Sequence, residues 1–573
     1  MAESIISPGV FQRENDISFI QPASIEAGAV ILGPTVKGPV EVPTIVTSYN
    51  DFTRKFGVTF ELGSSKEEFL TSLAVKSYFE QGGNTCLVTR VVSIATNWTN
   101  ASSTFISSSA GTEPFTLGTL GKGAIYNASS ASLQAGDELA DGSLTSGSAD
   151  NLRWEISNVE PTQGTFTLSV RRGDDNTNSK IVLETFNNLS LDANSTNYIE
   201  KVIGNQSSAI TADGTAILQV GEYINQSNFI RVASVPHKIL NYLANDGVTY
   251  TPENADKLPS AGKGSFYGGV GEISTTAKLY GNISNVNTQG LAATDYTKVI
   301  TLLSNADDYQ FNIISAPGLI KNLHSAQIDS ILSLVENRGD AIAVVDTVEY
   351  GSTVGAAKTQ ATGMNSSYGA TYWPWLQVQS ATGKNVWVPA SVVIPGIYAF
   401  TDGASAPWFA PAGLVRGGLV GVIQAERKLT RTDRDTLYNG KVNPIATFPG
   451  TGLAVFGQKT LQTKASALDR VNVRRLLIDL KKFIGGVSQG LVFEQNTITT
   501  RNKFLSTVNP YLESVTQRQG LYAYRVVMDD TNNTADVIDR NQLVGQIFIQ
   551  PAKTAEFIVL DFVVEPSGAT FGA

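Results

Sequence analysis

The sequence predicts a multidomain protein that combines α/β and α+β parts. Three observations lead to this fold class. A buried strand, an amphipathic helix and a second buried strand follow one another over residues 308–345. Residues 96–235 carry short alternating runs between Asn, Asp and Gly turns, and a long helix pattern at 466–484 opens a C-terminal part that closes with strands. At about 150 residues per domain, the chain of 573 residues predicts about four domains.

The first 95 residues are predicted to form an arm and the beginning of an α/β core. Residues 1–22, in which Ser7-Pro8-Gly9 interrupts regular structure, are expected to be an N-terminal extended arm. Residues 23–95 form the N-terminal part of the core. Its expected elements are strands over 28–32, 42–47 and 86–92, an amphipathic helix over 49–56 and a helix that ends at Gly82-Gly83.

The start of that last helix carries a capping pattern. Ser65-Lys66-Glu67-Glu68 has the form of a capping box, with Ser65 as the N-cap and Glu68 reaching back to it. The helix is therefore expected to begin directly after Ser65.

The middle of the chain is predicted to hold two insertions and the rest of the core. Residues 96–235 are expected to be a β-rich surface insertion, and residues 236–289 a loop-rich insertion or linker. Residues 290–445 complete the α/β core, because their strand–helix–strand succession requires a parallel sheet. The apolar, Gly-rich tract 413–423, interrupted by Arg416, is interpreted as buried core.

Residues 446–548 are predicted to form a C-terminal domain. Its clearest helix, over 466–484, has an apolar stripe at i, i+3, i+4, i+7 and i+11 that consists of Val473, Leu476, Leu477, Leu480 and Ile484. A second helix over 500–519 should be kinked or broken by Pro510. Residues 549–573 are expected to be a C-terminal strand or arm, whose run 556–564 is apolar on both faces and must be covered from both sides.

The composition excludes several classes of protein. Charged residues make up 16% of the chain, against roughly 25% in an average soluble protein, and the net charge is −9. This argues against a nucleic-acid binder and against a disordered chain. No signal-peptide pattern opens the chain and no run of about 18 apolar residues is present, so we expect a soluble protein made in the cytosol, without membrane insertion.

The sequence supplies little for catalysis or for cofactor binding. Cys86 is the single cysteine and His237 and His324 are the only histidines, so metal sites and His-based triads are poorly supported. No Lys in a Gly-rich stretch is followed by Ser or Thr, which excludes a complete phosphate loop. Residues 174–178 resemble the start of a calcium loop, but Ser179 stands where Gly is needed, and a polar turn is favoured. We therefore predict no catalytic residue, cofactor or metal.

Several stretches resemble the tail sheath proteins of contractile-tailed (myovirus) bacteriophages. The resemblance runs in order through residues 1–95 and about 290–573, and the segment 96–289 shows no match. Phe456-Gly457 departs from the Trp-Gly that is frequent in the family. The stretches include Ser7-Pro8-Gly9-Val10, Lys37-Gly38-Pro39, Val442-Asn443-Pro444-Ile445, Phe448-Pro449-Gly450-Thr451-Gly452, Lys459-Thr460-Leu461, Val473-Arg474-Arg475-Leu476 and Val492-Phe493-Glu494-Gln495-Asn496.

The resemblance implies a structural protein rather than an enzyme. It implies a subunit that polymerises helically around a tail tube in a metastable extended state and contracts to drive the tube through the host envelope. The implied partners are other copies, the tube protein, and baseplate and tail terminator proteins at the ends, within a virion tail assembled in the host cytoplasm. The α/β core of this family resembles a subtilisin fold without protease activity.

Two sets of residues are candidates for assembly. The resemblance implies that both chain ends add strands to neighbouring subunits, and the residues expected to take part are Ile5, Ile6, Val10, Phe11, Phe557, Ile558, Val559, Leu560 and Phe562. Cations gather opposite the apolar stripe of helix 466–484, and we predict that this face contacts acidic groups of the tube. This predicted tube contact consists of Arg470, Arg474, Arg475, Ile478, Lys481 and Lys482.

Other interpretations remain open at this point. The face of helix 466–484 could instead be solvated or paired with Asp469 and Asp479. The protein could be the sheath of a related contractile injection device, such as a secretion system or a bacteriocin-like particle. A hydrolase of subtilisin-like fold is disfavoured by the two histidines. A host-binding adhesin is suggested only by the β-rich insertion.

Overall fold

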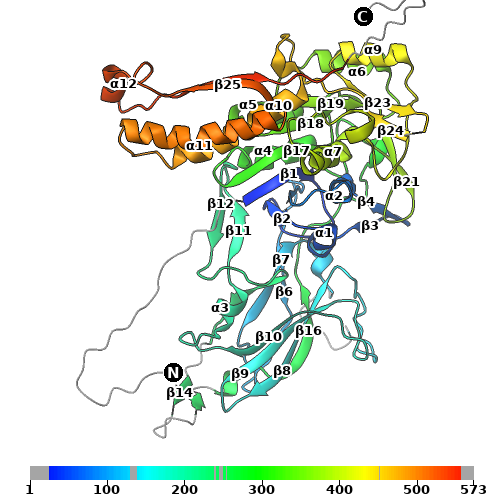
Figure 1. The fold of residues 1–573 in the computed structure, drawn as a ribbon. Coiled ribbons are helices and arrows are strands. Elements are labelled where there is room, and N and C mark those ends of the chain that lie inside the picture. The colour runs from blue at the N-terminus through cyan, green and yellow to red at the C-terminus, as the bar shows by residue number, and fades with distance from the viewer. Residues whose placement is uncertain are drawn as a thin grey trace, which may run out of the picture.

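An eight-stranded, mostly parallel sheet forms the centre of the protein (Figure 1). The structure is a computed structural model that describes residues 25–128, 138–237, 241–243, 250–252, 255–450 and 452–556. The predicted strand–helix–strand unit is confirmed, because β17 and β18 are parallel neighbours joined by α5 (Ser325–Arg338). In spatial order the strands are β2 (Thr44–Val46), β5 (Cys86–Arg90), β1 (Ile25–Gly33), β17 (Tyr309–Ile320), β18 (Ile342–Asp346), β19 (Gly369–Trp373), β23 (Asn443–Phe448) and β24 (Gly452–Val455).

Helices cover both faces of this central sheet. Along β1, Ala29 and Ile31 pack into one core, and Val30 and Leu32 pack into the other, as expected for a parallel sheet that is buried on both sides. The first core includes α1 (Tyr49–Phe56), α2 (Leu70–Glu80) and α7 (Ile394–Ala404). The second includes α4 (Thr297–Leu302), α5, α6 (Val354–Thr362) and α9 (Arg431–Asn439).

The capping box predicted at Ser65 is wrong. Residues Ser65–Glu68 form strand β4, paired with β3 (Thr59–Leu62), and α2 begins only at Leu70 with Phe69 as its N-cap. The Glu68 carboxylate is fully buried and accepts hydrogen bonds from Ser72 Oγ (2.6 Å) and from the backbone N–H of Ala381 (2.7 Å). Its role is thus to join α2 to a distant loop, which a local pattern of residues does not reveal.

The apolar tract 413–423 is not buried core, as predicted, but lies largely exposed. It forms α8 (Gly413–Arg416) and runs into β22 (Val422–Ala425), the edge of a small sheet with β20 (Leu376–Gln379) and β21 (Asn385–Val388). Val415 is 83% exposed and Val420 57% exposed. The sequence pattern was apolar, but the fold leaves this segment without a covering element among the described residues.

A second, antiparallel body is inserted between α2 and α4, and we call residues 99–270 the insertion domain. The chain enters and leaves it at one point, where Thr99 N donates to Val270 O (3.1 Å). Its seven-stranded sheet packs on a separate core that includes Trp154 and Phe166. In spatial order the strands are β10 (Val182–Ser190), β9 (Thr165–Arg172), β8 (Leu152–Glu160), β16 (Gly262–Tyr267), β6 (Asn100–Ser103), β7 (Thr116–Lys122) and β13 (Ile230–Ser234).

The predicted boundary at residue 235 is wrong. Strand β16 lies within the segment expected to be a linker, yet it pairs with both β8 and β6 in the middle of the sheet. The described part of residues 236–270 thus completes the insertion domain, whereas Ile283 and Gln289 pack against the central core. Smaller elements complete this body, namely α3 (Ile199–Ile203), the hairpin of β11 (Ser207–Ile210) and β12 (Ile217–Val220), and the pair β14 (Asn241–Leu243) and β15 (Tyr250–Pro252).

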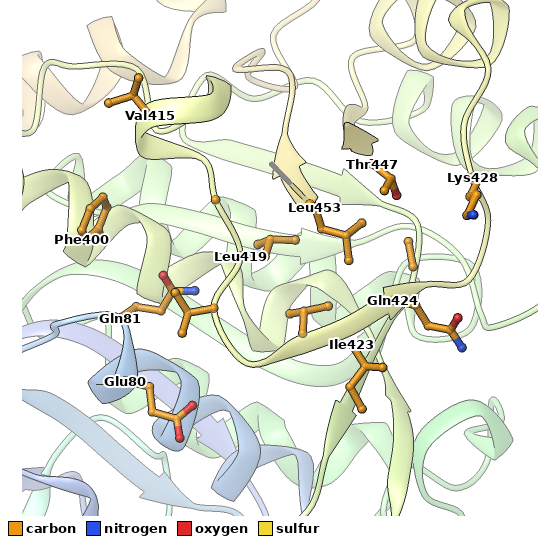
Figure 2. A pocket seen from close by; sticks show the side chains of 15 residues that line it. Glu80, Gln81, Phe400, Val415, Leu419, Ile423, Gln424, Lys428, Thr447 and Leu453 are labelled. Atoms are coloured by element: carbon orange, nitrogen blue, oxygen red, sulfur yellow. The ribbon is translucent and has the colours of Figure 1, made fainter. Parts of the chain in front are cut away.

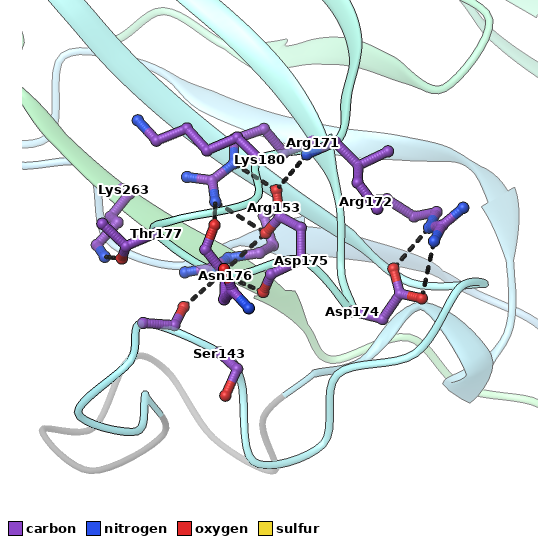
Figure 3. Close-up of polar contacts among 12 residues, drawn as sticks. Ser143, Arg153, Arg171, Arg172, Asp174, Asp175, Asn176, Thr177, Lys180 and Lys263 are labelled. Atoms are coloured by element: carbon purple, nitrogen blue, oxygen red, sulfur yellow. Dashed lines mark hydrogen bonds and ion pairs between the residues drawn. The ribbon is translucent and has the colours of Figure 1, made fainter.

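The turn that resembled a calcium loop is tied to arginines instead (Figure 3). The Asp175 side chain is completely buried and accepts from Arg171 Nε (2.7 Å) and Nη2 (2.8 Å) and from Arg153 Nη1 (3.1 Å). Glu155 and Glu138 extend the network outward from the two arginines to Lys180 and Lys263. The predicted polar turn is therefore correct, and the Asp175 carboxylate neutralises two buried guanidinium groups.

The C-terminal domain projects from the central sheet as a helical hairpin with a two-stranded ribbon (Figure 1). It consists of α10 (Val471–Gln489), α11 (Ile498–Gln517), β25 (Leu521–Val527), α12 (Ala535–Asp539) and β26 (Gln546–Pro551). Strand β24 belongs to the central sheet, so the domain begins after it and not at the predicted residue 446.

The break expected in the second helix does not occur, because α11 continues through Pro510. Residues on both sides of the proline hold the helix against α10 and the ribbon. Val508 and Leu512 are fully buried in the core of the C-terminal domain, and the Tyr511 ring stacks on Phe483 with centroids 3.7 Å apart. This packing offsets the missing backbone hydrogen bond.

Candidate assembly site

The ribbon of β25 and β26 has one covered and one open face. Tyr524 lies opposite Ile549, and Val526 lies opposite Ile547; these four side chains pack against the helices α10 and α11. On the other face Arg525 lies opposite Phe548, whose side chain is 56% exposed. Side chains alternate between the two faces of the ribbon, and this alternation places the aromatic ring of Phe548 on the outer face of a sheet that has only two strands.

Both outer edges of this ribbon are free within the described part of the chain. There, β25 and β26 pair with each other and with no other strand. Unpaired edges expose rows of backbone N–H and C=O groups that can pair with a strand of another chain. A two-stranded sheet is also weak alone and gains stability when strands are added. The ribbon is therefore suited to accept extended segments.

The end of the described chain is anchored through Glu556. Its carboxylate accepts from Arg470 Nε (2.7 Å) and Nη2 (3.0 Å), from Tyr438 Oη (2.8 Å) and from Gln458 Nε2 (3.0 Å). Although burial raises the pKa of Glu556, these hydrogen bonds outweigh it and hold the pKa below its usual range. The segment after the ribbon thus leaves from a fixed point beside α9 and α10.

The expected strand-exchange residues cannot be placed against this geometry. Ile5, Ile6, Val10 and Phe11, as well as Phe557, Ile558, Val559, Leu560 and Phe562, lie outside the described residues. What the structure adds is a two-stranded ribbon with unpaired edges and an anchored residue, Glu556, at the end of the described chain.

The predicted cationic face of α10 is not an open surface, and half of the expected residues are buried. Arg474, Arg475 and Ile478 are each 4% exposed. Arg475 Nη2 donates to both carboxylate oxygens of Asp402 on α7 (2.6 Å each), and its guanidinium lies 4.7 Å from the Tyr398 ring. Their role as a tube contact is therefore corrected, since these residues fasten α10 to the central domain.

Arg474 makes a second link of the same kind. Its guanidinium stacks on the Tyr368 ring at 3.9 Å and Nη2 donates to Ser367 Oγ (2.5 Å). Burial lowers the pKa of Arg474 from its usual value. Ile478 joins the core of the central sheet, while Leu476 and Leu480 of the predicted stripe pack into the C-terminal core. Helix α10 is thus buried on two sides and connects both cores.

The other three residues of the predicted face are partly accessible. Arg470 is paired with Glu556 and with Asp469 (3.0 Å), the second of which agrees with the alternative left open from the sequence. Lys482 donates to Phe311 O (3.0 Å) and to Asn312 Oδ1. Lys481 is exposed, although its Nζ lies 3.0 Å from Tyr368 Oη. Of the six residues, Lys481 alone combines a charge with an exposed side chain.

Sequence reasoning missed the partners that make these contacts. Tyr368, Asp402 and Tyr438 lie 73 to 118 positions from the α10 and Glu556 groups that they contact. No local pattern marks any of them. The one signal in the sequence was the small share of charged residues. In a chain with few charges, a cation is more often paired with another group of the same fold than left exposed.

His324 lies directly before α5, as its N-cap residue. His324 Nδ1 accepts from the backbone N–H of Ile320 (3.1 Å), and Nε2 lies 3.1 Å from Ser284 O. Both ring nitrogens of His324 are therefore occupied by backbone groups, and burial lowers its pKa. Among the described helices, none has the length and apolar character needed to cross a membrane.

Comparison with known proteins identifies two domains in the second half of the chain. Residues 289–461 match the phage tail sheath protein central domain, and residues 463–565 match the phage tail sheath C-terminal domain. The tail sheath protein of Vibrio phage KVP40 is 33% identical over 317 residues, which are 54% of this chain and 46% of that protein. The tail sheath protein of Enterobacteria phage T4 is 42% identical over 187 residues, 33% of this chain and 28% of that protein.

A solved structure extends the likeness in fold. The crystal structure of a sheath tail protein from Listeria innocua superposes with a TM-score of 0.50 and 10% identity, over 92% of this chain and 96% of that one. The chain spans less than half the length of the two curated phage relatives. The resemblance seen in the sequence is confirmed in the second half of the chain, where residues 289–461 and 463–565 match the two domains of the phage tail sheath family.

Proposed function

We propose that the protein is the structural subunit of a contractile phage tail sheath. It polymerises helically around the tail tube in a metastable extended state, and it contracts to drive the tube through the host envelope. The match of residues 289–565 to both sheath domains carries this proposal. Its partners are other copies of itself, the tube protein, and baseplate and terminator proteins, in a virion tail assembled in the host cytoplasm.

The energy for contraction is stored during assembly. A polymer that is trapped in an extended form can release free energy by rearranging its contacts, without a nucleotide. An open helical polymer needs heterologous contacts, in which one patch meets a different patch of the next copy. The free edges of β25 and β26 support such a contact, because an extended arm of a neighbour can add to them.

The proposal includes a core of subtilisin type without protease activity. The mixed α/β sheet with helices on both faces is compatible with that fold. The bonding of His324 by two backbone groups supports a structural role for this residue. Absence of peptide hydrolysis by the purified protein is the corresponding measurement, and measurable turnover would contradict this part of the proposal.

Contact with the tube is proposed through Lys481, an exposed residue near the middle of α10. A Lys481→Glu variant is expected to bind isolated tail tubes about twofold to fivefold more weakly, because rim charges contribute little to affinity. Co-sedimentation with purified tubes at low and high salt measures this change. Unchanged binding at low salt would contradict a tube contact at Lys481.

Removal of residues 557–573 is expected to abolish polymerisation without unfolding the protein. The truncated chain keeps Glu556 and the ribbon, but it loses the apolar segment proposed to pair with a neighbour. Electron microscopy should show long tubes for the full chain and none for the truncated chain at the same concentration. A chain that lacks only residues 569–573, beyond the apolar run, is the control and should still form tubes.

Two results would count against the proposal in different ways. Tubes formed by the chain ending at Glu556 would exclude an essential exchange through the C-terminal segment. Discrete monomers of the full chain at high concentration would contradict the sheath function itself.

A further inference from the structure

A groove lined by both apolar and polar side chains opens beside the exposed tract 413–423 (Figure 2). It has a volume of about 710 Å³ and lies between β22, the β23–β24 hairpin and the ends of α2 and α7. Ile423, Leu419 and Leu453 lie along it, Phe400 and Val415 stand at one end, and Lys428 stands at the other. The groove thus has apolar side chains along its middle and polar ones around them, with Lys428 at one end and Glu80 and Gln81 toward the other.

The exposure of this groove is unusual for a soluble surface. Val415, Val420 and Ile423 are 83%, 57% and 49% exposed. Single exposed apolar residues are common, but a contiguous group around a hollow marks an interaction site. In a chain with only 16% charged residues, we expect such an apolar surface to be buried by a binding partner.

A matching protrusion lies at the tip of the α10–α11 hairpin, and we call residues 491–498 the tip. Phe493 is completely exposed, and Val492 and Ile498 are 61% and 67% exposed. Phe493 also has a φ of 70°, a left-handed conformation that is costly for an aromatic residue. Such backbone strain persists where the surrounding structure fixes it, and it is concentrated at functional sites.

The tip is held in place by hydrogen bonds to the rest of the domain. Asn496 Nδ2 donates to Gln542 O (2.8 Å) and to Asn533 Oδ1 (3.2 Å), and Arg501 Nε donates to Asn496 Oδ1 (2.8 Å). The Phe493 side chain is therefore presented by a supported turn. A preorganised anchor loses less conformational entropy when it binds.

The chemistry of the two surfaces identifies the occupant as a second copy of this chain. The tip carries Glu494 next to Phe493, and the groove carries Lys428 at its end; both are exposed and neither forms an ion pair within the described residues. An exposed aromatic side chain beside an anion thus complements the Lys428 end of the groove, where apolar side chains lie beside a cation and away from Glu80. Contacts of this composition place the aromatic anchor in a pocket and the charges at the rim.

The positions of the two surfaces favour contact between copies over contact within one. Asn496 at the tip contacts the segment after α12, which stands at the far left of Figure 1, whereas β24 beside the groove stands at the right. Two different patches at opposite ends form a heterologous contact, which adds copies in an open series.

We propose that Phe493 of one subunit inserts into the groove of the next, with Glu494 facing Lys428. This inference rests on the proposed polymerisation and names a contact separate from strand exchange. It assigns a function to the exposed apolar tract and to the strained Phe493.

Disulfide trapping tests the contact directly in the full chain. The only native cysteine, Cys86, is buried, so introduced thiols report without background. Under mild oxidation, a mixture of the Phe493→Cys and Ile423→Cys variants is expected to give a covalent dimer, whereas each variant alone gives none. Phe493→Cys mixed with Val286→Cys is the control, since Val286 is 72% exposed and does not line the groove.

Charge exchange gives a second readout. Glu494→Lys and Lys428→Glu are each expected to raise the critical concentration for polymerisation, by about fivefold at most, and the double variant is expected to restore it. Phe493→Ser should raise it by roughly thirtyfold or more, as expected for a buried aromatic anchor.

The outcomes separate this inference from the proposed function. Tubes without a trapped 493–423 dimer, or equal trapping with Val286→Cys, would overturn the contact and leave the sheath function standing. A trapped dimer in the absence of tubes would support the contact and contradict the sheath function. Failure of the double charge variant to recover polymerisation would also overturn the pairing of Glu494 with Lys428.

Discussion

Replacing Asp175 with alanine is expected to unfold the insertion domain and leave the central sheet folded. The Asp175 carboxylate is fully buried between the guanidinium groups of Arg153 and Arg171. Its removal leaves the two buried guanidinium groups side by side without their common counterion, and each then keeps only one partly exposed glutamate, Glu138 or Glu155. Breaking a buried pair in this way costs about 3–5 kcal/mol, a large part of the stability of an ordinary domain.

The neighbouring Asp174 provides a matched control. It pairs with Arg172 at the surface, where both side chains are about one-third exposed, so Asp174→Ala should cost less than about 1 kcal/mol. Calorimetry and limited proteolysis would distinguish the two variants, and cleavage within residues 99–270 is expected only for Asp175→Ala. Equal resistance of the two variants would show that the network does not hold the domain together.

Replacing Arg475 with alanine is expected to loosen the C-terminal domain from the central domain. Arg475 is buried and gives both of its short hydrogen bonds to Asp402, whose pKa burial already raises. The variant leaves that carboxylate without its cation and removes the stacking on Tyr398. Because Asp402 keeps some access to water, the cost is expected to be about 3 kcal/mol, at the lower end for a broken buried pair.

The effect should concentrate at the joint between the two domains. Hydrogen exchange is expected to increase in the first half of α10, and proteases should cut between residues 461 and 471. Lys481→Ala on the same helix is the control, because an exposed lysine should change stability by less than about 1 kcal/mol. If both variants behaved alike, the link between Arg475 and Asp402 would not fasten the domains.

The regular elements of this protein were largely predictable because they depend on local patterns. The helix over 49–56, the parallel unit 308–345 and the helix over 325–337 follow from hydrophobic periodicity and are confirmed. The capping pattern at Ser65 failed because pairing with β3 outweighed a local helix signal. Strand β16 was missed because its place in the sheet depends on partners more than 100 positions away.

The candidate site was harder to predict than the regular elements, because its contacts depend even more on residues that are distant in the sequence. The cations of α10 were correctly placed on one face of the helix, but the sequence does not tell whether that face meets solvent or another domain. Three of the six residues are buried by partners on α7 and around Tyr368. The prediction for the tract 413–423 was wrong in the opposite sense, because the tract is exposed in this chain. Apolar composition predicts that a segment is buried, but it does not tell whether the same chain or another chain covers it.

The joined ends of the insertion domain have a consequence for how such a protein can change. Because Thr99 and Val270 are joined by two hydrogen bonds, from Thr99 N to Val270 O (3.1 Å) and from Val270 N to Thr99 Oγ1 (2.9 Å), the long segment between them replaces what could be a short turn. Further contacts fix the insertion domain to the core, among them the Lys37–Asp150 ion pair (2.9 Å) and the hydrogen bond from Arg90 Nη1 to Lys122 O (2.8 Å). A longer chain between the joined ends adds little entropic cost. Because its two ends are neighbours, the insertion domain can be lengthened, shortened or exchanged without a change in the strand order of the central sheet.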